Sequence, residues 1–244
     1  MIKINVSIDI SKALSRLDAA REQVPFATAL ALTKTAQAVQ TDLVDEMRRV
    51  FKSPTPFTMA SLYVKSAKKS DLTAYVWVKD RQRRYMLTEI EGGPRNVKGF
   101  EALLIRAGIM PSGWYAVPAS GAPLDQYGNV SGGLIGKLLS QLQAARESLQ
   151  NESLAKKQRR NRRNNQVGSF FAIQVGQTSH LRPGIYMRQS ATSRGGIVPI
   201  FIFVSRAPAY RARFDFYGVG ARMARQRFPL EFDRAITVAL RTAK

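Results

Sequence analysis

The residues best suited to binding a ligand form one short basic run. It holds six positive charges in eight residues, carried by Lys156, Lys157, Arg159, Arg160, Arg162 and Arg163. Arginine binds phosphate oxygens through a planar fork, and lysine offers a point charge beside it. Repulsion between like charges favours an extended segment. The run therefore predicts a basic internal loop that touches DNA or an acidic protein surface; a plain solvated loop is the alternative.

The charge of the whole chain points the same way. Its 244 residues include 38 Lys and Arg against 17 Asp and Glu, a formal net charge of +21. Such an excess is typical of proteins that work beside polyanions. From Arg159 onward, 16 basic residues face only three acidic ones. No helix-turn-helix, zinc-finger or aromatic RNA-binding motif accompanies them, so we expect contact with the nucleic-acid backbone without reading of its sequence.

Residue types that catalysis or metal binding requires are scarce. The chain has no cysteine and a single histidine, His180, which excludes thiolate chemistry and clusters of thiolate or imidazole metal ligands. No acid lies near His180 in Gln177–Arg182 to orient it as a catalytic base. Gly132–Lys137 lacks the spacing of a phosphate-binding loop, and the acids within 42–46 suit a solvated helix face. We therefore expect no enzymatic activity, no cofactor and no metal.

The elements that position the basic run begin at the N-terminus. Alternation over Lys3–Asp9 predicts a strand. Asp9 or Ser11 can then cap a short helix, whose apolar stripe lies within 13–20. Pro25 suits the first turn of the next helix, after which apolar residues recur every three or four positions as far as Val50. This stripe predicts a long amphipathic helix that packs within its own domain; packing against a neighbouring subunit is the alternative.

A proline-rich connector follows that helix. Each proline disfavours helical geometry in the residue before it, so Pro54, Pro56 and Phe57 are predicted to lie in a rigid extended segment. Two roles are open for these residues. The favoured role is to position the long helix over the next strands. The other is to form a subunit interface by docking on an adjacent copy.

The rest of the chain mixes strand and helix patterns. A hairpin of 63–67 with 72–79 precedes a short helix over 81–90, and Gly92–Pro94 ends that helix. The further predicted elements are a small helix over 100–107, a helix over 135–150, strands over 169–175, 184–188 and 197–204, and a last amphipathic helix over 214–240.

Together these patterns predict an α+β fold. Long N-terminal and C-terminal amphipathic helices pack on a largely antiparallel β-sheet. We expect a single domain over 1–244, in which 92–168 is an elaboration of loops and helices that contains the basic segment 156–163. No apolar run is long enough to span a membrane, and the first ten residues do not read as a secretory signal, so the pattern predicts a soluble protein.

Several motifs resemble the minor tail protein Z group of tailed bacteriophages. They are Pro54-Thr55-Pro56-Phe57-Thr58, then Ser61-Leu62-Tyr63-Val64-Lys65, a charged hairpin, and Val78-Lys79-Asp80. The likeness continues through Tyr85-Met86, Glu91-Gly92-Gly93, Arg95 and Lys98. It is clearest over 26–118, and it returns over 182–186 and 199–216.

This resemblance implies a structural protein of the virion, assembled in the host cytoplasm. Its implied place is the neck, as a tail completion protein at the head-proximal end of the tail that helps to form the DNA passage. The implied partners are the tail terminator, the connector, the tail tube and further copies in a ring, expected to be sixfold, with no membrane. A charge of +21 on every ring subunit would need compensation by acidic protein or DNA phosphate. A free, nonspecific nucleic-acid-binding protein is the alternative.

Overall fold

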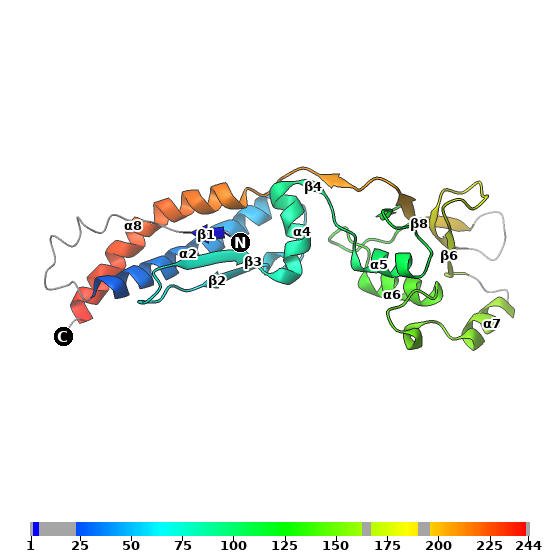
Figure 1. Cartoon of the computed structure of the whole chain (residues 1–244), viewed down its shortest axis with the longest axis horizontal. Coiled ribbons are helices and arrows are strands. Elements are labelled where there is room, and N and C mark those ends of the chain that lie inside the picture. Colours follow the sequence, from blue (N-terminus) through cyan, green and yellow to red (C-terminus); the bar gives the residue numbers. More distant parts are fainter. Residues whose placement is uncertain (1, 5–22, 163–166, 190–195, 243–244) are drawn as a thin grey trace. The chain divides into compact units, whose positions relative to one another are not determined.

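The chain divides into two compact units. The computed structural model describes residues 2–4, 23–162, 167–189 and 196–242 (Figure 1). Met1–Gly93 and Tyr210–Lys244 form one unit, here called the terminal unit, and Pro94–Ala209 form the other, the central unit. Each unit buries its own apolar cluster, and the two clusters share no residue. The structure thus has two cores where the sequence pattern predicts one domain over 1–244.

Two long helices make up most of the terminal unit, as predicted. Helix α2 spans Val24–Val50 and α8 spans Phe216–Thr242. Pro25 lies in the first turn of α2, where a missing backbone donor costs little. Figure 1 shows the two helices side by side. They run antiparallel, since Phe51, just after α2, contacts Phe214, just before α8, with ring centroids 5.7 Å apart.

A three-stranded antiparallel sheet packs against α2. Strands β1 (Ile2–Ile4), β2 (Leu62–Lys65) and β3 (Ala74–Val78) lie in the order β1-β3-β2, which confirms the predicted hairpin. Ala74, Val76 and Val78 are buried in the core shared with α2, and the side chains between them on β3 are half-buried. The predicted continuation of β1 to Asp9 and the short helix predicted after it lie outside the described residues.

The connector after α2 is not extended throughout, so that prediction was wrong in part. Pro56–Met59 form a one-turn helix, α3. Thr55 causes this turn, because its Oγ1 accepts a hydrogen bond from the Thr58 N–H at 3.1 Å. Helix α4 (Asp80–Glu91) follows β3 as predicted and ends at Gly92, whose φ of +74° favours glycine.

The central unit contains a four-stranded antiparallel sheet in the order β5-β8-β7-β6. The strands are β5 (Tyr115–Pro118), β6 (Phe170–Ile173), β7 (Gly184–Arg188) and β8 (Ile197–Val204). The last three confirm predicted strands, whereas β5 was not predicted. Helix α5 (Gly99–Arg106), helix α6 (Gly132–Gln141), a 3₁₀ turn η2 (Ser148–Gln150) and helix α7 (Leu154–Arg162) complete the unit.

Segment 92–168 is therefore more than an elaboration, because α5, α6 and β5 supply buried residues of the second core, such as Leu104, Ala116 and Leu138. The helix predicted over 135–150 is shorter than expected. It ends at Gln141, and Gln143 then turns the chain with a φ of +59°.

The chain crosses between the units twice, at β4 (Gly93–Pro94) and at β9 (Ala209–Tyr210), and these short strands pair with each other. The predicted α+β class, with long helices near both ends and antiparallel sheets, is confirmed. The predicted single sheet is instead divided between two cores.

Candidate polyanion-binding surface

The basic run lies on a helix, so the prediction of an extended loop was wrong. Helix α7 covers Lys156 to Arg162, and Arg163 lies outside the described residues. Ser153 starts the helix, because its Oγ accepts a hydrogen bond from the Lys156 N–H at 3.3 Å. Lysine, arginine and glutamine are strong helix formers, and each like-charge pair one turn apart costs only a few tenths of a kcal/mol.

Three cations of α7 are open to solvent. Lys156, Lys157 and Arg159 are exposed, and the backbone of Arg160 and Arg162 continues the same helix. None of these three side chains forms an ion pair or a hydrogen bond within the described part of the chain. A helix of nine residues is about 14 Å long, so it offers its charges at the regular spacing of helical geometry.

Several arginines of the terminal unit, unlike the cations of α7, form ion pairs with nearby acids. Arg48 and Arg49 pair with acids three residues earlier on α2, and Arg213 pairs with Glu89 of α4 at 2.7 Å. Arg227 reaches Asp42 across the two long helices at 3.2 Å. Each of these pairs places a cation of the terminal unit beside an acid of the same unit.

The two units differ in their supply of acids. In the sequence the central unit has 15 Lys and Arg against four Asp and Glu, a net +11, and the terminal unit has 23 against 13, a net +10. The net charges are similar, but the central unit has less than one acid for every three cations. Its cations can therefore be neutralised only in small part from within.

Pro54, Pro56 and Phe57 belong to the terminal unit, whereas α7 belongs to the central unit. Pro56 and Phe57 are exposed, Phe57 to 52%, and Pro54 is partly buried. The α3 turn is fixed to α4, because Gln82 Nε2 donates a hydrogen bond to the Phe57 carbonyl at 3.2 Å and Thr58 Oγ1 lies 3.2 Å from the Tyr85 hydroxyl. The Phe57 ring is thus held on a rigid base.

Beside this turn lies a second basic cluster that the charge pattern of the sequence did not bring out. Lys79, Arg81, Arg83 and Arg84 are exposed at the start of α4, and none of them has an ion pair among the described residues. The only acid in that first turn is Asp80. The sequence signal was the run Arg81-Gln82-Arg83-Arg84, which is shorter than the run on α7 and lies beside a hairpin.

A buried ion pair in the central unit is a candidate for an active site, because buried charged groups often take part in catalysis. Arg95 Nη2 and Nη1 donate to Glu101 Oε1 and Oε2 at 2.6 and 2.8 Å, and the carboxylate is fully buried. It also accepts the backbone N–H groups of Lys98 at 2.6 Å and Ala116 at 2.8 Å. Burial alone would raise the pKa of Glu101, but the hydrogen bonds from Arg95, Lys98 and Ala116 lower it overall.

This pair has a structural role. Both carboxylate oxygens are occupied by protein donors, and the Arg95 guanidinium also lies 5.2 Å from the centre of the Tyr115 ring. The pair therefore joins the start of α5 to β5 and leaves Glu101 no free position for a substrate. His180 lies on an exposed loop and has no acid partner in the described residues.

Two other kinds of site are absent from the described residues. No helix there is long and apolar enough to cross a bilayer. No three His, Asp or Glu residues there gather into a metal-binding group.

Comparison with known proteins adds no relative. No protein-family model matches the chain, and no curated protein or solved structure matches it either. The resemblance to the minor tail protein Z group therefore stays a prediction.

Proposed function

We propose that this chain is a structural virion protein of a tailed bacteriophage. In this proposal it is a tail completion or neck component that forms a ring at the head-proximal end of the tail and contacts DNA or an acidic neighbour there. The observation that carries the proposal is the exposed set of cations on α7, which have no acid partner among the described residues. The motif likeness over 26–118 supports the placement in the phage tail.

The chemistry of α7 suits a backbone contact rather than a chemical step. Lys156, Lys157 and Arg159 can each neutralise a phosphate, and no hydrogen-bonding partner in the described chain competes for them. Contacts of this kind hold DNA in place without reading its bases. A DNA passage needs such contacts, since every sequence in the genome must move through it.

The proposed subunit contact uses the α3 turn. Phe57 is an exposed aromatic ring on a rigid base, which is a typical anchor in protein interfaces. In a ring each subunit would present this side chain to a different surface of the next copy, a heterologous contact that closes by rotation. The interface would bring together copies of a chain that carries +21, so compensation by phosphate or acidic protein would be needed.

A free, nonspecific nucleic-acid-binding protein is the second candidate. The same cations of α7 favour it, since they need no ring to reach a phosphate backbone. The two functions differ in what the isolated chain does. A free binding protein forms its complex as a monomer, whereas a neck component forms a ring or joins the particle.

Salt dependence of duplex binding tests the DNA contact. The triple variant Lys156→Gln, Lys157→Gln, Arg159→Gln should reduce the log–log slope of affinity against salt by up to about 2.7, since the slope falls by about 0.9 for each phosphate that is no longer neutralised. The matched control Lys34→Gln, Lys52→Gln, Arg225→Gln removes the same charge from exposed positions of the terminal unit. Equal slopes for the two variants would contradict a specific role for α7.

Particle analysis tests the virion assignment. Mass spectrometry of purified phage should detect the chain, and labelled antibodies should mark the head–tail junction. Sedimentation of the isolated protein should reveal a ring or a weak oligomer that Phe57→Ser disperses. A chain that is absent from particles and sediments as a monomer while binding duplex would favour the second candidate.

A further inference from the structure

The outer face of the three-stranded sheet carries a set of side chains that the proposed function does not use. On β3, Tyr75 and Trp77 lie between the buried positions and therefore occupy the face turned away from α2. Lys65 lies opposite Tyr75 on β2, and Tyr63 lies opposite Trp77. These four residues are called the aromatic–lysine face below.

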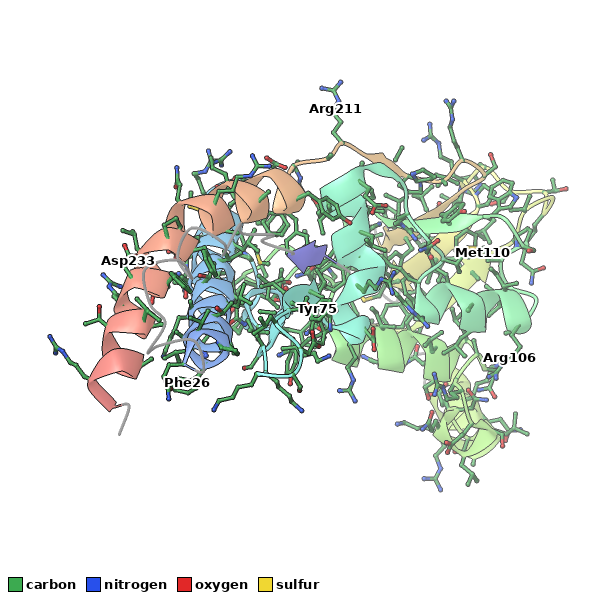
Figure 2. All side chains as sticks on the ribbon, turned by 60° about the vertical axis from the view of Figure 1, so that its left-hand side comes forward. Phe26, Tyr75, Arg106, Met110, Arg211 and Asp233 are labelled. Atoms are coloured by element: carbon green, nitrogen blue, oxygen red, sulfur yellow. The ribbon has the colours of Figure 1, made fainter. Side chains whose placement is uncertain are left out.

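The rings on this face are partly exposed, and each contacts a side chain on the neighbouring strand. Tyr63 is 48% exposed, and its ring centre lies 4.7 Å from that of Trp77. Lys65 Nζ lies 5.1 Å from the centre of the Tyr75 ring. Figure 2 marks Tyr75 on the sheet, with Asp233 on α8 as a reference point in the same unit. The face thus combines aromatic surface with positive charge.

Its charge is one-sided. Neither β2 nor β3 contains an acidic residue. Lys68 in the hairpin turn and Lys79 after β3 add positive charge at opposite ends of the strands, and both are exposed. Asp71 is the acid of the turn, where its backbone pairs with that of Lys68. A ligand lying along the strands would meet lysines at both ends and rings between them.

We propose that the aromatic–lysine face binds single-stranded nucleic acid. Tyr75 and Trp77 are two residues apart on one strand, so they stand about 7 Å apart, which is wider than the 3.4 Å rise between stacked nucleotides and suits a strand whose bases have separated from one another. Successive unstacked bases can therefore lie on the Tyr75 ring and on the Tyr63–Trp77 pair while phosphates approach the lysines. Base–aromatic stacking of this kind tolerates any sequence.

A single strand suits this face better than other polyanions do. The bases of a duplex are stacked on one another, so their faces cannot reach the rings. An acidic polypeptide would use the lysines but gain nothing from the aromatic surface. The inference does not rest on the proposed function, because it concerns another unit and another ligand.

Oligothymidylate of about 20 nucleotides, long enough for one site, is the probe for the full-length chain. Fluorescence anisotropy should show that the double variant Tyr63→Thr, Tyr75→Thr loses at least tenfold in affinity for this probe and keeps its affinity for duplex. Threonine retains a high strand propensity, so the sheet should persist. The control Tyr217→Thr removes an exposed ring from α8 and should bind as the wild type does.

A second variant and a mapping experiment test the proposal even if the double tyrosine variant does not fold. Lys65→Gln leaves all rings in place and should lower the salt slope for oligothymidylate by about 0.7. Light-induced crosslinking of a bromodeoxyuridine probe to the wild-type chain should map to residues 62–79. Crosslinks confined to α7, unchanged affinity of the tyrosine variant, or displacement of the probe by polyglutamate at equal charge would each overturn the proposal.

The two proposals fail separately. Loss of duplex binding in the α7 variant with oligothymidylate binding intact supports the aromatic–lysine face on its own. Loss of both ligands in the α7 variant would show that the single strand binds α7, which would overturn this inference and leave the DNA contact of α7 standing.

Discussion

The terminal and central units build their apolar cores from different parts of the chain. The terminal unit joins distant parts of the chain, since α2 near one end packs along α8 near the other. The central unit is one continuous stretch, and a buried ion pair lies at the junction of α5 and β5. The first core therefore depends on both ends of the chain, whereas the second needs only its own residues.

Truncation should give the largest effect. Residues 1–93 alone lack Phe214, Phe216 and Phe228, which are buried against α2, so this fragment should show no cooperative unfolding. Residues 94–209 alone should unfold cooperatively, because their apolar cluster is complete. Circular dichroism during heating measures both. A central fragment without a thermal transition would mean that the second core also needs the rest of the chain.

Loss of the buried acid should be the next largest effect. Glu101→Gln leaves the Arg95 charge buried without its counter-ion, a change that typically costs about 3–5 kcal/mol. Urea unfolding should show this loss in the central unit and not in the terminal unit. The control Glu147→Gln alters an exposed acid of the same unit and should leave the midpoint within error.

A cavity in the core of the terminal unit tests whether the two units unfold independently. Met47 of α2 is fully buried in the core of the terminal unit, so Met47→Ala should destabilise that unit by about 2–5 kcal/mol. The transition of the central unit should stay in place. If both transitions shift together in urea, the units are energetically coupled and the division into two cores is too simple.

Acid should weaken the central unit. The pKa of Glu101 is lower in the folded chain than in the unfolded chain, so its contribution is present above the unfolded value and is lost as the pH falls through the folded value. Urea midpoints measured from neutral to strongly acidic pH should therefore fall in the wild type. This dependence should be weaker in Glu101→Gln.

Removal of the exposed cations should change stability least. The triple variant of α7 should shift the urea midpoint of the central unit by an amount equivalent to less than about 0.5 kcal/mol, in either direction, since none of the three side chains has an ion-pair partner in the described chain. A large loss of stability would mean that these side chains support the fold, and reduced DNA binding could then not be assigned to direct contact.

Local patterns allowed much of the fold to be predicted. The apolar stripes of α2 and α8 and the alternation of β2 and β3 are visible in the sequence, and all four elements are present. Strand β5 was missed because it is short and contains a proline, and its pairing with β8 depends on residues far along the chain. The division into two cores was missed because local periodicity does not say which stripes meet.

The positive charge of the candidate site was predicted from the sequence, but its helical structure was not. The charge of the α7 run is evident in the sequence, yet the helix propensity of lysine and arginine and the cap at Ser153 outweigh the repulsion between its charges. The basic cluster on α4 and the pairing of Arg95 with Glu101 were missed. The first is a short run, and the second depends on a contact between a loop and α5.

The paired strands at the two crossings have a consequence for shortening the chain. Because β4 and β9 lie against each other, the central unit leaves and rejoins the terminal unit at nearly the same point. A tight turn could replace the whole insertion without stretching the backbone. Since none of the described residues within 94–209 belongs to the apolar core of the terminal unit, we expect a chain shortened in this way to keep that core.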